Sequence, residues 1–118
     1  TTIPTSGISF KRAFFENCLE FNLFDSYPTL EIDFRLNFFA QRILRKFLII
    51  EENLTIYRKV NDGVMSKIKF FSNNWWKKRL QAHYFINNAY KKSELSYKRN
   101  YDFYLTKSTV WLLNKITK

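Results

Sequence analysis

Residues 30–50 read LEIDFRLNFFAQRILRKFLII and give the clearest structural signal in the chain. Apolar residues recur there at steps of three and four, which is the spacing of a helix with one broad apolar face. The face comprises Leu30, Ile32, Phe34, Leu36, Phe38, Phe39, Ile43, Phe47, Leu48 and Ile50. The pattern predicts one long helix over residues 29–52, packed on more than one neighbour. On its polar arc, Glu31 and Arg35 are one turn apart and can pair.

A second helix is predicted before this segment, over residues 9–24. Its apolar positions are Phe10, Phe14, Cys18 and Phe21, again three and four residues apart. A serine before the helix, Ser6 or Ser9, can cap it. Because Cys18 is the only cysteine and lies on the apolar face, we interpret it as a small core residue.

The second half of the chain predicts two more helices and one strand. Asn73 or Asn74 can cap a helix over residues 75–92. Apolar and polar residues alternate over 97–105, as in an exposed strand, and Ser108 then begins a last helix. His83 lies within the third helix and is interpreted as a packed or surface residue.

Residues 54–71 leave two interpretations open. Both 54–60 and 64–71 are rich in β-forming residues, and Asn61-Asp62-Gly63 lies between them. Asp-Gly between two such runs indicates a β-hairpin. Two helices joined at Gly63 are the alternative.

The fold class predicted from these elements is mainly α. With two glycines and two prolines in 118 residues, few tight turns are available for a multi-stranded sheet. We expect a small single domain over 1–118, with residues 1–8 as an extended tail. If 54–71 forms a hairpin, the class becomes α+β.

The net charge of +10 is concentrated in the second part of the chain. Residues 1–50 carry six basic and five acidic side chains, whereas residues 51–118 carry fourteen basic and five acidic. Between Lys67 and Arg99, nine basic residues accompany one acid, Glu94, and aromatic residues alternate with them. Cations can bind phosphates while aromatic rings stack on unpaired bases, so this composition favours nucleic-acid binding.

The residues that we predict to bind RNA all come from this basic, aromatic region. They are Lys67, Lys69, Trp75, Trp76, Lys77, Lys78, Arg79, Lys91, Lys92, Lys98 and Arg99. Trp75 and Trp76 are adjacent on a helix, so one of the two rings should face away from the core and serve as a contact residue. The interpretation without RNA is a solvated basic face over an aromatic core.

The sequence lacks the usual parts of an active site. One cysteine and one histidine cannot build a Cys/His metal site, and two glycines 56 residues apart cannot form a phosphate-binding loop. No nucleophile, base and acid combination is recognisable. We therefore predict no enzyme activity, no cofactor and no metal. The long apolar segment 30–50 carries six charged residues, which argues against a membrane span.

The function predicted is a non-enzymatic structural RNA-binding subunit of a ribonucleoprotein, with an organellar (mitochondrial) ribosomal protein as the favoured class. The expected partners are RNA, ribosomal in that case, and neighbouring proteins. Abundant Phe, Tyr, Asn, Lys and Ile are typical of AT-rich coding, as in organelle genomes, so the mitochondrial matrix or another organelle is the expected location. The alternative is an accessory subunit of a mitochondrial inner-membrane respiratory or ATP-synthase complex, docked at the membrane surface.

Overall fold

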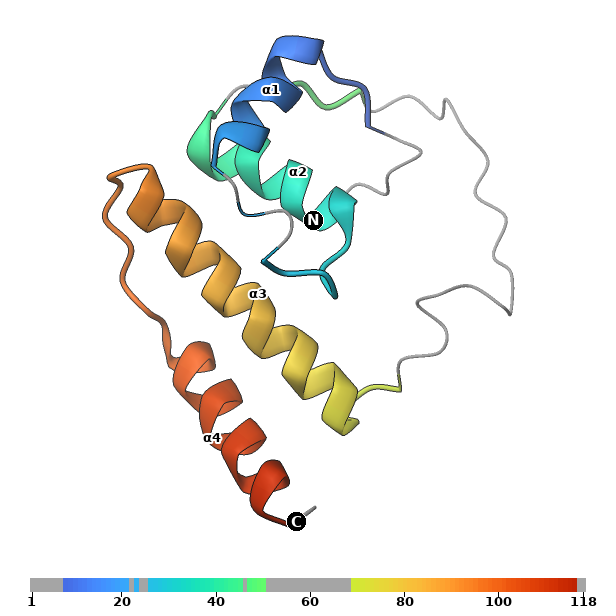
Figure 1. The fold of residues 1–118 in the computed structure, drawn as a ribbon, viewed down its shortest axis with the longest axis vertical. Helices are drawn as coiled ribbons and strands as arrows, with labels where there is room; N and C mark the ends of the chain where they lie inside the picture. Colours follow the sequence, from blue (N-terminus) through green and yellow to red (C-terminus); the bar gives the residue numbers. More distant parts are fainter. Residues whose placement is uncertain (1–7, 22, 24–25, 46, 51–68, 117–118) are drawn as a thin grey trace.

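The computed structural model describes residues 8–21, 23, 26–45, 47–50 and 69–116. Its elements are α1 (Arg12–Glu20), α2 (Ile32–Phe38), the π-helical turn η2 (Phe39–Ile43), α3 (Asn73–Lys92) and α4 (Tyr101–Ile116). The mainly α prediction is confirmed, since helices make up most of the described residues and no strand occurs among them. Figure 1 shows α3 between α4 on one side and α1 with α2 on the other.

The core between α3 and the N-terminal helices is centred on Phe85 of α3. Its ring centroid lies 5.6 Å from that of Tyr27, 5.6 Å from that of Phe38 and 5.9 Å from that of Phe39. Cys18 of α1 is fully buried in the same cluster, which confirms its interpretation as a core residue. Because aromatic rings here meet edge to face, the core gains ring–ring attraction in addition to the burial of apolar area.

On its other side, α3 packs against α4, which runs antiparallel to it (Figure 1). The buried residues of α4 are Phe103, Thr106 and Val110, which are three and four positions apart and so share one helix face. Phe103 packs against His83 and Tyr84, with centroid distances of 5.7 and 6.0 Å. Thus α3 buries two faces, one on each neighbour.

The predicted strand over 97–105 is wrong, and so is the predicted start of the last helix at Ser108. Helix α4 begins at Tyr101, and the side chain of Asn100 caps it by accepting a hydrogen bond from the backbone N–H of Phe103 at 3.1 Å. Alternation would place Tyr101, Phe103 and Leu105 on one face. Of the three, only Phe103 is buried. In a helix, residues two positions apart point to opposite sides, so Tyr101 and Leu105 face solvent.

The long helix predicted over 29–52 is shorter at both ends: α2 begins at Ile32, η2 ends at Ile43, and residues 46, 51 and 52 lie outside the described part of the chain. Helix α2 continues into the π-turn η2, in which the Leu44 N–H donates to the Phe39 carbonyl at 2.8 Å. Arg45 then adopts a left-handed φ of 52°, a conformation that commonly ends helices. Phe47 and residues 48–50 are non-helical and exposed, so the end of the predicted apolar face is not core.

Helix α1 lies inside the predicted range 9–24 but is shorter. Lys11, and not Ser9, is its N-cap residue, and no side-chain capping bond forms. The Glu31 carboxylate, which we predicted to pair with Arg35, forms an ion pair with Lys78 of α3. The Arg35 Nε donates to the Glu31 backbone carbonyl at 3.4 Å.

The β-hairpin predicted for 54–71 is not supported. Residues 54–68 lie outside the described residues, and 69–71 form a turn before α3 in place of the end of a return strand. The extended tail predicted for 1–8 also falls outside them, apart from Ile8.

Candidate nucleic-acid interface

The predicted interface lies mainly on α3, a helix whose position agrees closely with the prediction. Helix α3 runs from Asn73 to Lys92, close to the predicted 75–92. Ser72, and not the predicted Asn73 or Asn74, caps it, because its hydroxyl accepts a hydrogen bond from the Trp75 N–H at 3.3 Å. Two faces of α3 are covered by its neighbours, and part of the helix remains exposed to solvent.

Besides Asn74 and Lys92, the exposed residues of α3 are Lys77, Tyr84 and Lys91. The latter three are seven positions apart, close to two helical turns, so they lie in a row with about 10 Å of rise between successive members. Lys77 and Lys91 were predicted as RNA-binding residues, whereas Tyr84 was not. The heptad spacing of the three is the signal that could have identified it. We call this row the α3 strip.

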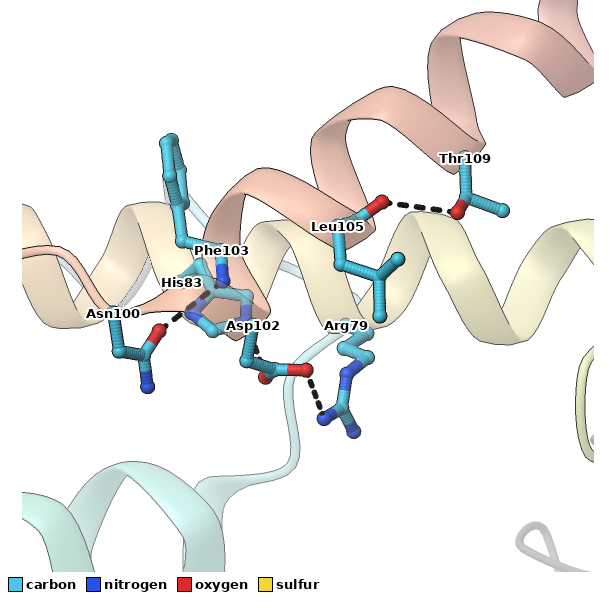
Figure 2. Close-up of polar contacts among 7 residues, drawn as sticks. All are labelled: Arg79, His83, Asn100, Asp102, Phe103, Leu105 and Thr109. Atoms are coloured by element: carbon cyan, nitrogen blue, oxygen red, sulfur yellow. Dashed lines mark hydrogen bonds and ion pairs between the residues drawn. The ribbon is translucent and has the colours of Figure 1, made fainter.

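Three of the predicted RNA-binding cations hold the fold together instead of standing free. Lys78 pairs with Glu31 at the start of α2. Arg79 donates to Oδ1 of Asp102 on α4 at 2.6 Å, as Figure 2 shows. The Lys92 ammonium donates to the backbone carbonyl of Phe21 at 2.5 Å. Each contact joins α3 to another part of the chain, so these side chains have structural roles.

Asp102 gives α4 its one acidic side chain, and it is turned toward α3 (Figure 2). The hydrogen bond from Arg79 lowers the pKa of this carboxyl group below its ordinary value, and the positive charge of Arg79 acts in the same direction, while burial opposes both. Its second oxygen lies 2.9 Å from Nε2 of His83. The negative charge of Asp102 is therefore compensated by side chains of α3.

The remaining predicted cations are exposed where the structure describes them. They are Lys69, Lys77, Lys91, Lys98 and Arg99, whereas Lys67 lies outside the described residues. Arg99 also packs its guanidinium 4.9 Å from the ring centroid of Phe103. Residues 69–116 contain ten basic and two acidic side chains. The surface of this part of the chain is thus strongly positive.

Trp75 and Trp76 belong to an aromatic cluster that also includes Phe70 and Phe71. The two indole rings are 4.7 Å apart and nearly perpendicular, and Phe71 lies 5.2 Å from Trp75 and 6.1 Å from Trp76. Both tryptophans are half-buried. The most exposed rings of this cluster are those of Phe70 and Phe71, which are absent from the predicted RNA-binding residues.

Within the described ranges, no group of three His, Cys, Asp or Glu side chains could hold a metal ion. No helix in that part of the chain is long and apolar enough to cross a membrane. Comparison with protein-family models, with curated proteins and with solved structures gave no match. Function is therefore inferred from the chain's own residues.

Proposed function

We propose that this protein is a non-enzymatic, structural RNA-binding subunit of a ribonucleoprotein, with an organellar (mitochondrial) ribosome as the favoured assembly. The observation that carries the proposal is the α3 strip, in which Lys77 and Lys91 flank the exposed ring of Tyr84. Exposed cations at intervals along one helix can neutralise phosphates of a single nucleic-acid chain. Lys98 and Arg99 extend the positive surface beyond the end of α3.

The distribution of acidic side chains supports the same proposal. In residues 69–116, Asp102 is engaged by Arg79 and His83, and Glu94 is the other acid. Uncompensated positive charge destabilises a folded protein through self-repulsion, and a polyanionic partner removes that cost. A nucleic acid supplies the required charge density.

The test is the salt dependence of RNA binding by the full chain. The Lys77→Ala/Lys91→Ala variant removes two exposed cations of the α3 strip. Within the part of the chain that the structure describes, neither side chain makes an ion pair like those of Lys78 and Arg79. Each lost phosphate contact should flatten the slope of log affinity against log salt by about 0.7 to 0.9. We therefore expect a decrease of roughly 1.4 to 1.8 in the magnitude of the slope for the double variant.

The matched control is Lys11→Ala/Arg42→Ala, which removes the same charge from exposed positions in the N-terminal half. Its slope should stay near that of the wild type. If both double variants change the slope equally, binding follows net charge alone and the α3 strip is not the interface. If neither variant changes it, the proposal of RNA contact through this strip fails.

A second candidate function is the accessory subunit docked at an inner-membrane surface, and the outer face of α4 favours it. That face exposes Tyr101, Tyr104, Leu105, Trp111, Leu112 and Ile116. Exposed aromatic and aliphatic side chains beside lysines are typical of helices at a lipid or protein interface. Lys115 lies 3.9 Å from the ring centroid of Trp111.

Co-sedimentation from native extracts separates the two candidates. A ribonucleoprotein subunit should leave its particle after nuclease treatment and remain after mild detergent. Release by detergent with no effect of nuclease would favour the membrane-surface subunit and overturn the RNA proposal.

A further inference from the structure

Phe70 and Phe71 are unusually exposed for rings that the fold holds in place. They directly precede Ser72, the cap residue of α3, and are 79% and 71% exposed. Their centroids lie 6.2 and 5.2 Å from that of Trp75. The two rings are therefore supported from the helix side by indole and open to solvent on the other.

Helix capping explains only part of this arrangement. Phe71 occupies the position before the N-cap and contacts Trp76, the fourth residue of the helix, as in a hydrophobic staple. A staple needs one apolar residue at that position, and Phe70 is not required. Moreover, the staple contact leaves most of the Phe71 ring in water. Capping therefore accounts for one contact and not for two exposed rings.

The backbone at Phe71 has a left-handed φ of 60°. Non-glycine residues rarely adopt this region, and for a bulky side chain the conformation is an outlier. Such strained residues occur preferentially at binding sites, where the surrounding structure maintains them. Here the conformation accompanies the presentation of both rings beside Trp75.

The charges around the rings indicate what kind of partner they suit. Lys69 and Lys77 are exposed on either side of the cluster in the sequence, and residues 69–79 contain four basic and no acidic side chains. The Arg79 guanidinium lies 5.2 Å from the centroid of Trp75, which adds positive charge behind the rings. Aromatic faces among cations match a chain that carries flat bases and phosphates.

We propose that Phe70 and Phe71 are a stacking site for unpaired bases of single-stranded RNA, with Lys69 and Lys77 binding the flanking phosphates. This inference rests on the proposed RNA-binding function and adds the class of RNA segment recognised. In a duplex the base faces are stacked on each other and are not accessible to a phenylalanine ring. The site should therefore discriminate single strands from duplexes.

The experiment compares binding of the full chain to a fluorescein-labelled 12-nucleotide single-stranded RNA and to a 12-base-pair RNA duplex. The Phe70→Ala/Phe71→Ala variant should lose single-strand affinity at least tenfold and keep duplex affinity within about twofold, because base–aromatic stacking contributes only where bases are unpaired. The control is Tyr101→Ala/Tyr104→Ala, which removes two exposed rings from the start of α4. It should bind both probes like the wild type.

A second variant keeps the result interpretable if alanine disturbs the start of α3. Phe70→Leu/Phe71→Leu retains apolar side chains against Trp75 and Trp76 but removes the aromatic faces. It should melt like the wild type and still lose single-strand affinity. Wild-type single-strand affinity in the leucine variant, or an equal loss on both probes, would overturn the stacking proposal.

Failure of this proposal can be distinguished from failure of the proposed function. If the wild type binds neither probe at near-physiological salt, both are overturned. If the wild type binds RNA and the Lys77→Ala/Lys91→Ala variant flattens the salt slope while the phenylalanine variants bind normally, RNA binding stands and base stacking at this site is wrong.

Discussion

Nε2 of His83 on α3 lies 2.9 Å from Oδ2 of Asp102 on α4, so the chain's one histidine joins these two helices. The other carboxylate oxygen accepts a hydrogen bond from Arg79 at 2.6 Å (Figure 2). The His83 ring is buried and meets Phe103 edge to face. These contacts fix the position of α4 along α3, since sliding one helix by a turn would break all of them.

The first prediction concerns the stability contributed by Asp102. Because Arg79 and Asp102 are 39% and 35% exposed, solvent screens the pair, and Asp102→Asn should lower the free energy of unfolding by about 1 kcal/mol at neutral pH. The lowered pKa of Asp102 means that its carboxylate stabilises the folded state above the ordinary pKa near 4, and that this contribution is lost as the pH falls through the lower folded-state pKa.

Urea denaturation between pH 7 and pH 2 provides the measurement. The wild type should lose stability toward acid more steeply than Asp102→Asn. Glu94→Gln, which neutralises an exposed acid near the end of α3, is the control and should keep the wild-type pH dependence. Parallel curves for wild type and Asp102→Asn would show that this carboxylate does not stabilise the fold.

The second prediction concerns the core. Phe39 is fully buried against Phe21 and Phe85, with centroid distances of 4.8 and 5.9 Å. Phe39→Ala should therefore reduce the free energy of unfolding by ~3 to 5 kcal/mol, as expected when a large core side chain is removed. Phe47→Ala is the control, because Phe47 is 54% exposed, and it should change stability by less than about 1 kcal/mol. Equal melting temperatures for the two variants would contradict the assignment of Phe39 to the core.

The third prediction concerns the cap of α4. Replacing Asn100 by alanine removes the acceptor for the Phe103 N–H and should cost about 0.5 to 2 kcal/mol. Asn100→Ser should restore most of the loss, since serine is also a good N-cap residue. Thermal melting followed by circular dichroism is sufficient. If alanine and serine give the same melting temperature, the side chain does not cap the helix.

The fourth prediction concerns Lys78, whose side chain is 19% exposed and pairs with that of Glu31, which is 31% exposed. This ion pair is less exposed than a surface ion pair and less buried than a core one. Lys78→Ala should therefore lower the free energy of unfolding by about 1 to 2 kcal/mol. Lys77→Ala, one residue away and exposed, should leave stability unchanged. Chemical denaturation of the two variants would measure the difference. Equal stabilities would show that the ion pair of Lys78 with Glu31 does not stabilise the fold.

The fifth prediction concerns the Cys18 thiol. Burial raises its pKa to about 11, and the thiolate is the reactive form. Native protein at pH 8 should therefore react with an aromatic disulfide reagent far more slowly than the same protein in denaturant. Reaction at the rate of a free thiol under native conditions would show that α1 does not cover this side chain.

Part of the fold could be predicted because the relevant signals are local. The helical spacing of α3 and the run of apolar residues around Cys18 can be read from neighbours in sequence. Such spacing is a property of the helix itself, so the sequence specifies it directly. The concentration of basic residues after residue 50 was likewise readable from the sequence.

The same local rules were ambiguous or misleading elsewhere. Tyr101, Phe103 and Leu105 alternate like a strand, yet Asn100 and the spacing of Phe103, Thr106 and Val110 also fit a capped helix. Burial against α3 selects the helix, because only that conformation covers the three spaced residues together. After α2 and η2, Arg45 adopts a left-handed conformation, the helix does not continue past Leu44, and Phe47 and residues 48–50 are exposed.

The sequence by itself determined the helical class, the position of α3 and the sign of the surface charge, because these follow from residue type and short-range spacing. Only the tertiary structure decided which cations are exposed. Lys78 and Arg79 follow Lys77 in the sequence and have the same charge. They pair with Glu31 and Asp102, which lie 47 and 23 residues away along the chain. The physical reason is that a side chain's charge is fixed by its chemistry, whereas its partner depends on which distant segments packing brings beside it.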